Sequence, residues 1–378
     1  MKNPITIDIA THGRFHVLDL ARELDKLGFS VRLHSYLPRR RALKFGLPSQ
    51  CSKSYFFRCA PLLFLQRVVP GFLRPFVSRA LVYYLDWLVS RSLRRCDIFI
   101  GMSGLFVLSA KKAKVKFGSK VLVERGSTHI ITQREILAGL RNAVQVQDWE
   151  VSREMLSYEL ADVIVIPSEH VEQSFVTNGV DKAKIFRNPY GVSTEMFVSR
   201  PRRKRERLTA IMTGTWCYRK GADLITDLIS RNPDISFIHV GAIWDHYFPN
   251  GSQFTHYDPV DQTELATFYD QADFFLLPSR EEGLSLVLAQ ALASGLPVVC
   301  SWRSGGGDLK NLISNPDMVI VLEDYSFSAL QAAISRVRSL LAGPLPTDAL
   351  GVVGRKSLTW SAYGERYGKF IVKLVERE

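Results

Sequence analysis

Short runs of apolar residues alternate along this chain with segments whose apolar residues recur at helical spacing. Residues 5–10 form the first run, residues 17–27 the first helical stripe, and residues 30–34 the second run. Gly28 follows the stripe, where a helix commonly ends in a left-handed residue. Further buried strands are predicted at 97–101, 120–124 and 163–167. This alternation predicts a doubly wound α/β domain, with helices covering both faces of a parallel sheet.

The second half of the chain repeats the alternation. Its predicted elements are a strand at 209–214, a helix at 222–230, a strand at 235–241, a helix at 264–271 and a strand at 274–277. A length of 378 residues and a hydrophobic content of 46% suit two domains of this kind. We place the division near residue 195 and interpret the basic run at 200–205 as a solvated linker.

The segment after the strand at 274–277 carries the strongest candidate site. Glu282-Gly283 is predicted to open a helix, Gly295 to end it, and Pro297 to prevent its continuation. The backbone N–H groups of residues 283–286 would then be unpaired donors at a helix start, which suit a diphosphate. A carboxylate beside an anion site is unfavourable unless it binds something else, such as sugar hydroxyls. The structural alternative is a buried strand–helix–strand unit without chemistry.

This arrangement resembles the donor site of the retaining glycosyltransferases of family 4. Their signature is a Glu followed, after seven intervening residues, by a second Glu. The motif lies between a Pro-Ser pair and a Gly-x-Pro-Val-Val segment. In this chain the first Glu of the motif is Glu282. The resemblance implies that Glu282 faces the donor sugar. It also implies that the donor is bound by the helix-start residues Gly283, Leu284, Ser285 and Leu286. Gln290 stands in the place of the second Glu. It lies about 12 Å along the helix from Glu282, where the ribose of the donor would lie. Its neutral amide would form a weaker hydrogen bond with a ribose hydroxyl than a carboxylate would form.

Other segments extend the resemblance over most of the chain. They are residues 158–168, residues 188–192, Gly214 with Arg219-Lys220-Gly221, residues 270–273, and Trp360-Ser361. The resemblance implies a GT-B fold, in which two Rossmann-like doubly wound domains face each other across a cleft. Residues 1–194 would bind the acceptor and residues 195–360 the nucleotide sugar, and a helix within residues 361–378 would cross back to the first domain.

The resemblance assigns roles to four further residues. Arg219 and Lys220 would stabilise the charge of the leaving nucleoside diphosphate without a metal ion. In much of the family the arginine directly follows the strand-end glycine, where Thr215 stands here, and we take Arg219 as its replacement. No DxD metal motif lies in a suitable loop, so neither a metal nor another cofactor is expected. Gly13 would let the backbone approach the donor phosphates, and His129 would orient the donor sugar. If these residues have no catalytic role, Arg219 and Lys220 are an ordinary exposed pair at a helix start, and His129 is a histidine that packs within the fold.

Positive charge is concentrated in one window of the first half. The formal net charge is +12, and residues 37–96 hold twelve basic residues against the single acid Asp86. The basic residues are Arg39, Arg40, Arg41, Lys44, Lys53, Arg58, Arg67, Arg74, Arg79, Arg91, Arg94 and Arg95. Large apolar side chains are interleaved with them, as in a helix or loop lying on an anionic membrane. Nucleic acid is the competing partner for a basic segment, but no nucleic-acid-binding module is recognisable in this chain. The alternative without a partner is that these helices pack on the first domain and expose a solvated basic face.

Together these features predict a retaining, metal-independent hexosyltransferase that uses a nucleotide sugar. The acceptor would be lipid-linked or a growing surface polysaccharide of the cell envelope. The chain begins without a signal peptide, lacks a long apolar run, and has five scattered cysteines. We therefore expect a cytoplasmic protein, peripheral at the inner face of the cell membrane.

Two alternatives stay open. One is a non-catalytic protein that binds nucleotide sugars or lipid, and the other is a nucleotide-sugar epimerase of the same fold. A nicotinamide dehydrogenase and a P-loop kinase are disfavoured, because neither GxGxxG nor GxxxxGK[ST] occurs.

Overall fold

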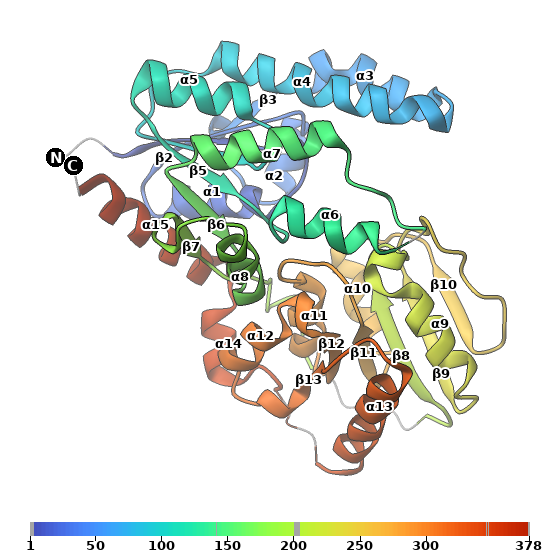
Figure 1. Ribbon diagram of the computed structural model, residues 1–378. Coiled ribbons are helices and arrows are strands. Elements are labelled where there is room, and N and C mark those ends of the chain that lie inside the picture. Colours follow the sequence, from blue (N-terminus) through green and yellow to red (C-terminus); the bar gives the residue numbers. More distant parts are fainter. Residues whose placement is uncertain (1–3, 141, 200–204, 345, 347, 377–378) are drawn as a thin grey trace.

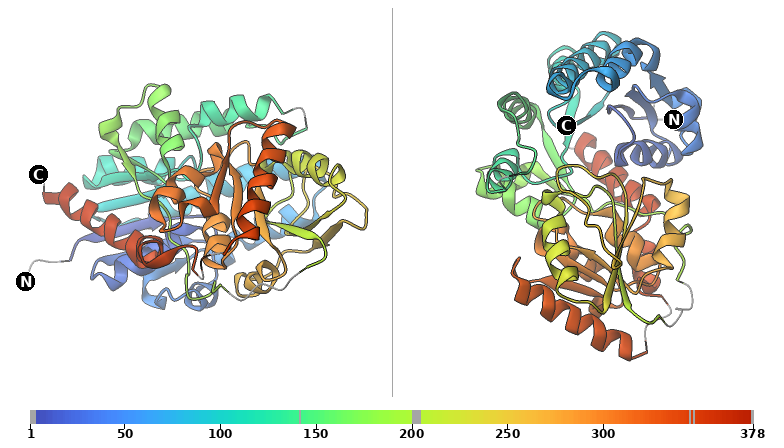
Figure 2. Two further views of the ribbon diagram at one scale, coloured as in Figure 1. Left: turned by 90° about the horizontal axis from the view of Figure 1, so that it is seen from below. Right: turned by 90° about the vertical axis from the view of Figure 1, so that its right-hand side faces the viewer.

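The computed structural model describes residues 4–140, 142–199, 205–344, 346 and 348–376. It contains two parallel sheets, of seven and six strands, and each sheet carries helices on both faces (Figure 1). The sheets lie in two halves of the molecule, which we call the first and the second domain (Figure 2). The predicted pair of doubly wound α/β domains is confirmed.

The first sheet has the strand order β3-β2-β1-β4-β5-β6-β7. Its strands are β1 (Thr6–Ala10), β2 (Ser30–Ser35), β3 (Ser52–Ser54), β4 (Ile98–Met102), β5 (Lys120–Glu124), β6 (Val163–Ile166) and β7 (Ile185–Arg187). Ile9 of β1 lies in register with Leu33 and Ile100, and all three are fully buried. Helices on both faces bury these strands, which is why they read as continuous apolar runs.

The helices of the first domain are α1 (His16–Lys26), α2 (Arg39–Lys44), α3 (Phe56–Val68), α4 (Arg74–Ser92), α5 (Val107–Phe117), α6 (Ile130–Ala138), α7 (Asp148–Leu160) and α8 (Glu169–Thr177). The apolar stripe of α1 is buried, as its spacing predicted. Helices α3 and α4 form a pair, joined by a bond from Gln66 to Ser78 of 2.7 Å. This pair lies at the end of the molecule away from the second domain (Figures 1 and 2).

The second sheet has the order β10-β9-β8-β11-β12-β13. Its strands are β8 (Leu208–Thr213), β9 (Ile235–Val240), β10 (Phe254–Tyr257), β11 (Phe274–Leu277), β12 (Val298–Ser301) and β13 (Val319–Leu322). Its helices are α9 (Ala222–Ser230), α10 (Gln262–Tyr269), α11 (Leu286–Ala293), α12 (Gly306–Leu312), α13 (Phe327–Ala342) and α14 (Gly351–Ser357). Strand order reverses between β1 and β4 and between β8 and β11, and the carboxyl ends beside such a point are where doubly wound sheets bind ligands.

The helix after β11 begins later than the sequence predicted. Residues 281–285 form a loop, and α11 starts at Leu286 with Ser285 as its N-cap. The amide of Ser285 donates to the carbonyl of Ser304 at 3.1 Å, so it is not an unpaired helix-start donor. The short edge strands β3, β7, β10 and β13 were also missed, because three or four residues at a sheet edge carry little periodic signal.

The C-terminal helix α15 (Trp360–Glu376) packs on α1 of the first domain, which confirms the predicted return of the chain. Gly364 allows the close approach, because a Cβ there would lie 2.4 Å from the Cβ of Glu23. Gly191 has a similar role where the interdomain segment meets the returning chain, since a Cβ there would lie 2.5 Å from the amide nitrogen of Trp360. The boundaries of the domains at residues 194 and 360 stay predictions.

Two sequence interpretations concern surface segments. Residues 200–204 of the basic run lie outside the described residues, and Arg205 bonds Asp273 at 2.7 Å. No helix in the described part of the chain is both long and apolar enough to cross a bilayer.

Candidate active site

A cavity of about 680 Å³ lies between the carboxyl ends of the two sheets. The loops after β1 and β5, the end of β4 and residues 190–192 contribute one wall, and the loops after β8 and β11 contribute the other. Its lining includes Arg14, Phe15, His16, Met102, Gly126, Ser127, Tyr190, Arg219, Lys220, Glu282, Leu284, Ser285, Leu286 and Gln290. The structure therefore brings most of the predicted donor-site residues to the point where ligands bind in such sheets.

Glu282 and the two predicted cations form one cluster in the second-domain wall. Lys220 Nζ lies 3.0 Å from Glu282 Oε2, and an Nη atom of Arg219 lies 3.9 Å from Glu282 Oε1. Burial opposes ionisation of Glu282, but Lys220 and Arg219 outweigh it and hold the pKa of Glu282 below its ordinary value. The cluster thus places a carboxylate and two basic side chains side by side at the cavity.

Glu281, which the sequence analysis did not single out, joins the two domains. Its side chain is fully buried and accepts bonds from Ser127, Thr128 Oγ1 (3.1 Å) and Gln133 (3.1 Å) of the first domain. Arg219 also lies 3.2 Å from its Oε2. Burial alone would raise the pKa of Glu281, but the Arg219 charge and the Ser127 bond outweigh burial, so that the net shift of this pKa is downward. The pair of adjacent acids in the sequence was the signal that could have suggested it.

Gly283 does not line the cavity but sets the distance between the domains. A Cβ at this position would lie 2.1 Å from the carbonyl oxygen of Gly126, in the loop after β5. The Gly283 carbonyl accepts from Ser168 Oγ at 3.0 Å, and the Glu282 carbonyl lies 2.9 Å from Nε2 of His170. The Glu282-Gly283 backbone is therefore held against the first domain while the Glu282 side chain faces the cavity.

The residues of the α11 start and of its first turns line the cavity. Leu284, Ser285, Leu286 and Gln290 all contribute to its surface. Gln290 Oε1 accepts from the Tyr269 hydroxyl at 3.3 Å, so one side of its amide is fixed within the second domain. The ribose-facing role of Gln290 stays a prediction, with its position at the cavity as the supporting observation.

The first-domain wall contains a histidine–carboxylate pair that sequence analysis did not assign to the site. His16, the first residue of α1, lines the cavity, and its Nε2 lies 2.9 Å from Oε2 of the buried Glu124. The ring of His16 packs on Tyr190 with centroids 4.3 Å apart. Burial raises the pKa of the Tyr190 phenol well above its ordinary value, so this residue is neutral. The sequence contains no signal for this role, because a histidine at a helix start can equally line a cavity or pack within the fold.

His129 is not among the residues that line the cavity. Its Nδ1 accepts from the amide of Ile131 at 3.4 Å at the start of α6, and its ring packs against Tyr158 and Phe175. Burial lowers the pKa of His129 to about 4, and the charge of Arg125 adds to the shift. The structure therefore favours the packing role that was the alternative, because the side chain turns into the core.

Gly13 lies in the loop after β1, directly before the cavity residue Arg14. A Cβ at Gly13 would meet nothing closer than the Tyr36 hydroxyl at 3.8 Å. Neither space within the protein nor a positive φ requires glycine here. Close approach to a bound phosphate stays the predicted reason for this residue.

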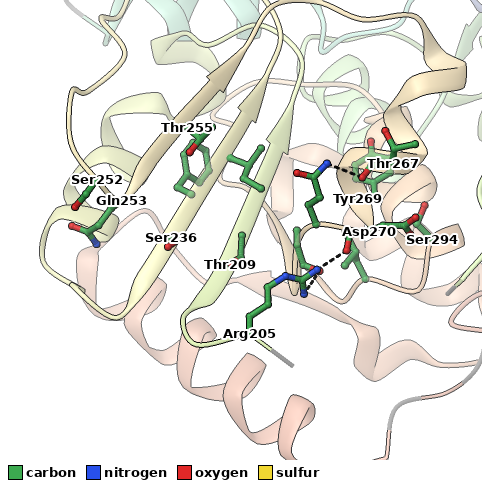
Figure 3. A pocket seen from close by; sticks show the side chains of 15 residues that line it. Arg205, Thr209, Ser236, Ser252, Gln253, Thr255, Thr267, Tyr269, Asp270 and Ser294 are labelled. Atoms are coloured by element: carbon green, nitrogen blue, oxygen red, sulfur yellow. Dashed lines mark hydrogen bonds between the residues drawn. The ribbon is translucent and has the colours of Figure 1, made fainter. Parts of the chain in front are cut away.

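A larger pocket of about 1020 Å³ lies against β8, β9 and β10 (Figure 3). Thr209, Ser236 and Thr255, each the second residue of its strand, contribute to it. It therefore lies toward the amino ends of the strands, away from the edge where doubly wound sheets bind ligands. The interdomain cavity is therefore the stronger candidate site.

Comparison with known proteins agrees with the geometry. Residues 208–339 match the family model described as glycosyl transferases group 1. Over 245 residues the chain is 28% identical to the GDP-mannose-dependent alpha-(1-6)-phosphatidylinositol monomannoside mannosyltransferase of Mycolicibacterium smegmatis, covering 56% of this chain and 62% of that protein. Over 228 residues it is 25% identical to a subunit of the phosphatidylinositol N-acetylglucosaminyltransferase of Arabidopsis thaliana, covering 56% and 50%. The chain thus spans little more than half the length of these curated relatives.

Solved structures share the whole fold at low sequence identity. Sucrose-phosphate synthase from Thermosynechococcus elongatus superposes with a TM-score of 0.70 at 16% identity, covering 99% of this chain and 100% of that one. Anabaena HepE in complex with UDP-glucose superposes with a TM-score of 0.63 at 10% identity, covering 99% and 100%. These similarities show the GT-B fold.

Proposed function

Because the chain belongs to the group 1 glycosyltransferases, we propose that it transfers a sugar from a nucleotide sugar to an acceptor in the interdomain cavity. The transfer would proceed with retention at the anomeric carbon. The observation that carries this proposal is the cluster of Glu282, Lys220 and Arg219 on the second-domain wall of that cavity. HepE, a protein of the same fold, binds UDP-glucose.

Lys220 and Arg219 suit the leaving group. When the bond from the anomeric carbon to the diphosphate oxygen breaks, the nucleoside diphosphate gains negative charge, which preorganised cations stabilise. Arg219 offers a planar fork of donors and Lys220 a compact charge. These two cations perform the task for which other transferases use a divalent ion, so we propose a metal-independent reaction.

Glu282 suits the donor sugar instead of acting as a nucleophile. Its charge is already balanced by Lys220 at 3.0 Å, and its second carboxylate oxygen can accept a sugar hydroxyl. The acceptor oxygen would bond the anomeric carbon on the face from which the diphosphate leaves. The proton of the acceptor would pass to the leaving phosphate oxygen, which keeps atoms and charge balanced without a separate base.

The acceptor is the part of the proposal that rests on the first domain. We propose a lipid-linked or surface-polysaccharide acceptor, used by a cytoplasmic protein at the inner face of the cell membrane. Two relatives are named for transfer to phosphatidylinositol lipids. Residues 37–96 carry twelve basic residues and a single acid, and each basic residue near an anionic bilayer contributes about 1 kcal/mol to binding.

The decisive experiment measures nucleotide release from a panel of UDP-, GDP-, ADP- and dTDP-sugars. Each sugar is incubated with and without a membrane extract, in buffer with and without a chelator. We expect acceptor-dependent release of one nucleoside diphosphate, unchanged by the chelator, and a product whose anomeric configuration by NMR equals that of the donor. If no donor releases its nucleotide, the protein binds nucleotide sugars or lipid without catalysing transfer. If the sugar of the donor changes in the absence of an acceptor, the protein is an epimerase.

A further inference from the structure

Helix α3 carries an apolar stripe that no other part of the described chain covers. Phe57 and Phe64, seven residues apart, are 89% and 66% exposed, and Leu65 and Val68 continue the same side. The turn into α4 adds Phe72 and Phe76, which are 73% and 69% exposed. Soluble proteins rarely leave so many large apolar side chains together in water, so this face is expected to meet a partner.

The segment that carries this stripe is strongly basic. Asp86 is the one acidic residue between residues 37 and 96, and it is buried against Arg153 at 2.9 Å. Arg58, Arg67 and Arg74 are exposed beside the apolar side chains. A second copy of the chain would bring two of these basic segments together. Charge complementarity therefore favours an anionic apolar partner, which is the chemistry of an anionic lipid surface.

A groove of about 580 Å³ opens beside this face, where β2 and β3 end and α2 and α3 begin. It is lined by Pro38, Arg39, Arg40, Ser54, Phe56 and Phe57. Its floor and sides are apolar, and two exposed arginines stand at its rim. Neither Arg39 nor Arg40 forms an ion pair with another described residue. The groove thus combines space for a hydrocarbon chain with two free guanidinium groups.

We propose that this groove binds a single anionic lipid. Its phosphate would lie on Arg39 and Arg40, and the first part of its chain would lie along Phe56 and Phe57. The α3 stripe would hold the protein at the leaflet from which that lipid enters. The purpose of the site, to hold a lipid acceptor near the cleft, rests on the proposed function, whereas the binding itself can be measured without any reaction.

The groove lies on the same edge of the first sheet as the reaction cavity. β2 ends directly before it, and Tyr36 extends from there to within 3.8 Å of the Cβ position of Gly13. The ring of His12 lies 6.1 Å from the ring of Tyr36 and 4.6 Å from that of Phe15, which lines the cavity. A row of aromatic rings therefore runs from Phe15 at the cavity to Tyr36, two residues before Pro38 of the groove. In the proposed complex, a head group longer than a phosphate would extend along this row toward the donor.

The test uses decyl phosphate below its micelle concentration, with decanol and inorganic phosphate as separate probes, in calorimetric titrations. We expect decyl phosphate to bind more tightly than either fragment. R39Q/R40Q should weaken it by about tenfold or more, because two charge-assisted bonds are lost. R91Q/R95Q removes the same charge from the same window outside the groove, and it should change binding by no more than about twofold.

A second pair of measurements separates the groove from the α3 stripe. F64S/F72S should reduce sedimentation with phosphatidylcholine vesicles that contain phosphatidylglycerol, while decyl phosphate binding stays unchanged. Equal binding of inorganic phosphate, or equal loss in R39Q/R40Q and R91Q/R95Q, would overturn the lipid site. If either of these two results is found while the protein still releases nucleotide from a donor, the groove proposal fails and the transferase proposal stands. Release by none of the panel donors, with decyl phosphate still bound, would support the groove and contradict the transferase.

Discussion

The two walls of the interdomain cavity are built differently. The second-domain wall concentrates charge, because Glu282 lies within 3.9 Å of both Lys220 and Arg219. The first-domain wall is more mixed: it has the aromatic Phe15 and Tyr190, a His16–Glu124 pair whose carboxylate is buried, and the charged Arg14 and Asp19. A diphosphate needs fixed cations, whereas an acceptor is recognised largely by shape and hydroxyl bonds. This contrast supports the proposal that the donor binds to the second domain and the acceptor to the first.

The largest expected effect comes from the charged wall. Lys220→Ala removes a cation from the developing diphosphate, and Glu282→Gln removes a charged acceptor for the donor sugar. Each should lower turnover by about 10²–10³. Lys220→Ala should also weaken binding of the nucleoside diphosphate in calorimetry, whereas Glu282→Gln should leave that binding nearly unchanged, because its partner is the sugar.

Arg231→Ala is the matched control for this pair. Arg231 follows α9 and forms an exposed ion pair with Asp227 at 2.8 Å, which is worth little to stability. Its turnover should be normal. Near-normal turnover in Lys220→Ala and Glu282→Gln as well, at unchanged melting temperatures, would mean that the reaction lies elsewhere and that the charged wall is structural.

The next effect tests whether the walls must be held at their present separation. Gly283→Ala places a methyl group where the Gly126 carbonyl lies 2.1 Å away, so the domains must move apart. A displacement of about 1 Å can cost about 10² in turnover. Gly307→Ala is the control, because a Cβ there meets nothing within 4 Å. Equal kinetics of the two variants would show that the cavity functions without this contact.

A smaller effect should distinguish two histidines of the first domain. His16→Phe removes a polar group that lines the cavity, and we expect turnover to fall about tenfold, somewhat less than the loss of a full acid–base catalyst. His129→Phe should change turnover by less than about twofold, because the side chain faces the core. The opposite ranking would support the direct role that the sequence predicted for His129 and would place His16 among the packing residues.

The pH dependence of unfolding provides a second readout for His129. Its pKa is about 4 in the folded chain, against an ordinary value of about 6.5. Between these values the unfolded chain binds a proton that the folded chain does not, so stability is complete above pH 6.5 and falls as the pH drops toward 4. In His129→Phe this fall should be shallower by about 1–3 kcal/mol in denaturant titrations. Parallel curves for the two proteins would contradict the buried neutral histidine.

The sequence predicted the second-domain wall better than the first, for physical reasons. Glu282, Lys220 and Gln290 belong to local segments whose glycines and prolines fix the chain, so their spacing predicts their positions. His16 and Glu124 are 108 residues apart in sequence, and only the pairing of β1 with β4 and of β4 with β5 brings them together. The apolar stripe of α3 was recognised as unusual composition, but its exposure follows from which side of the helix packs on α4.

The smallest effect concerns Gln290, which stands where the family signature has its second Glu. Gln290 lines the charged wall as a neutral residue, and its Oε1 already accepts from Tyr269 at 3.3 Å. In Gln290→Glu one carboxylate oxygen can keep that bond while the other accepts a ribose hydroxyl as a charged group. We expect nucleoside diphosphate binding to tighten by about 1 kcal/mol, the usual difference between a charged and a neutral hydrogen bond.

Calorimetry with the diphosphate and with its free base separates the causes, because the base lacks ribose and its binding should not become tighter. Weaker binding of the diphosphate would mean that Gln290 faces a phosphate, since a new carboxylate repels that group, and the ribose would then lie elsewhere on the wall.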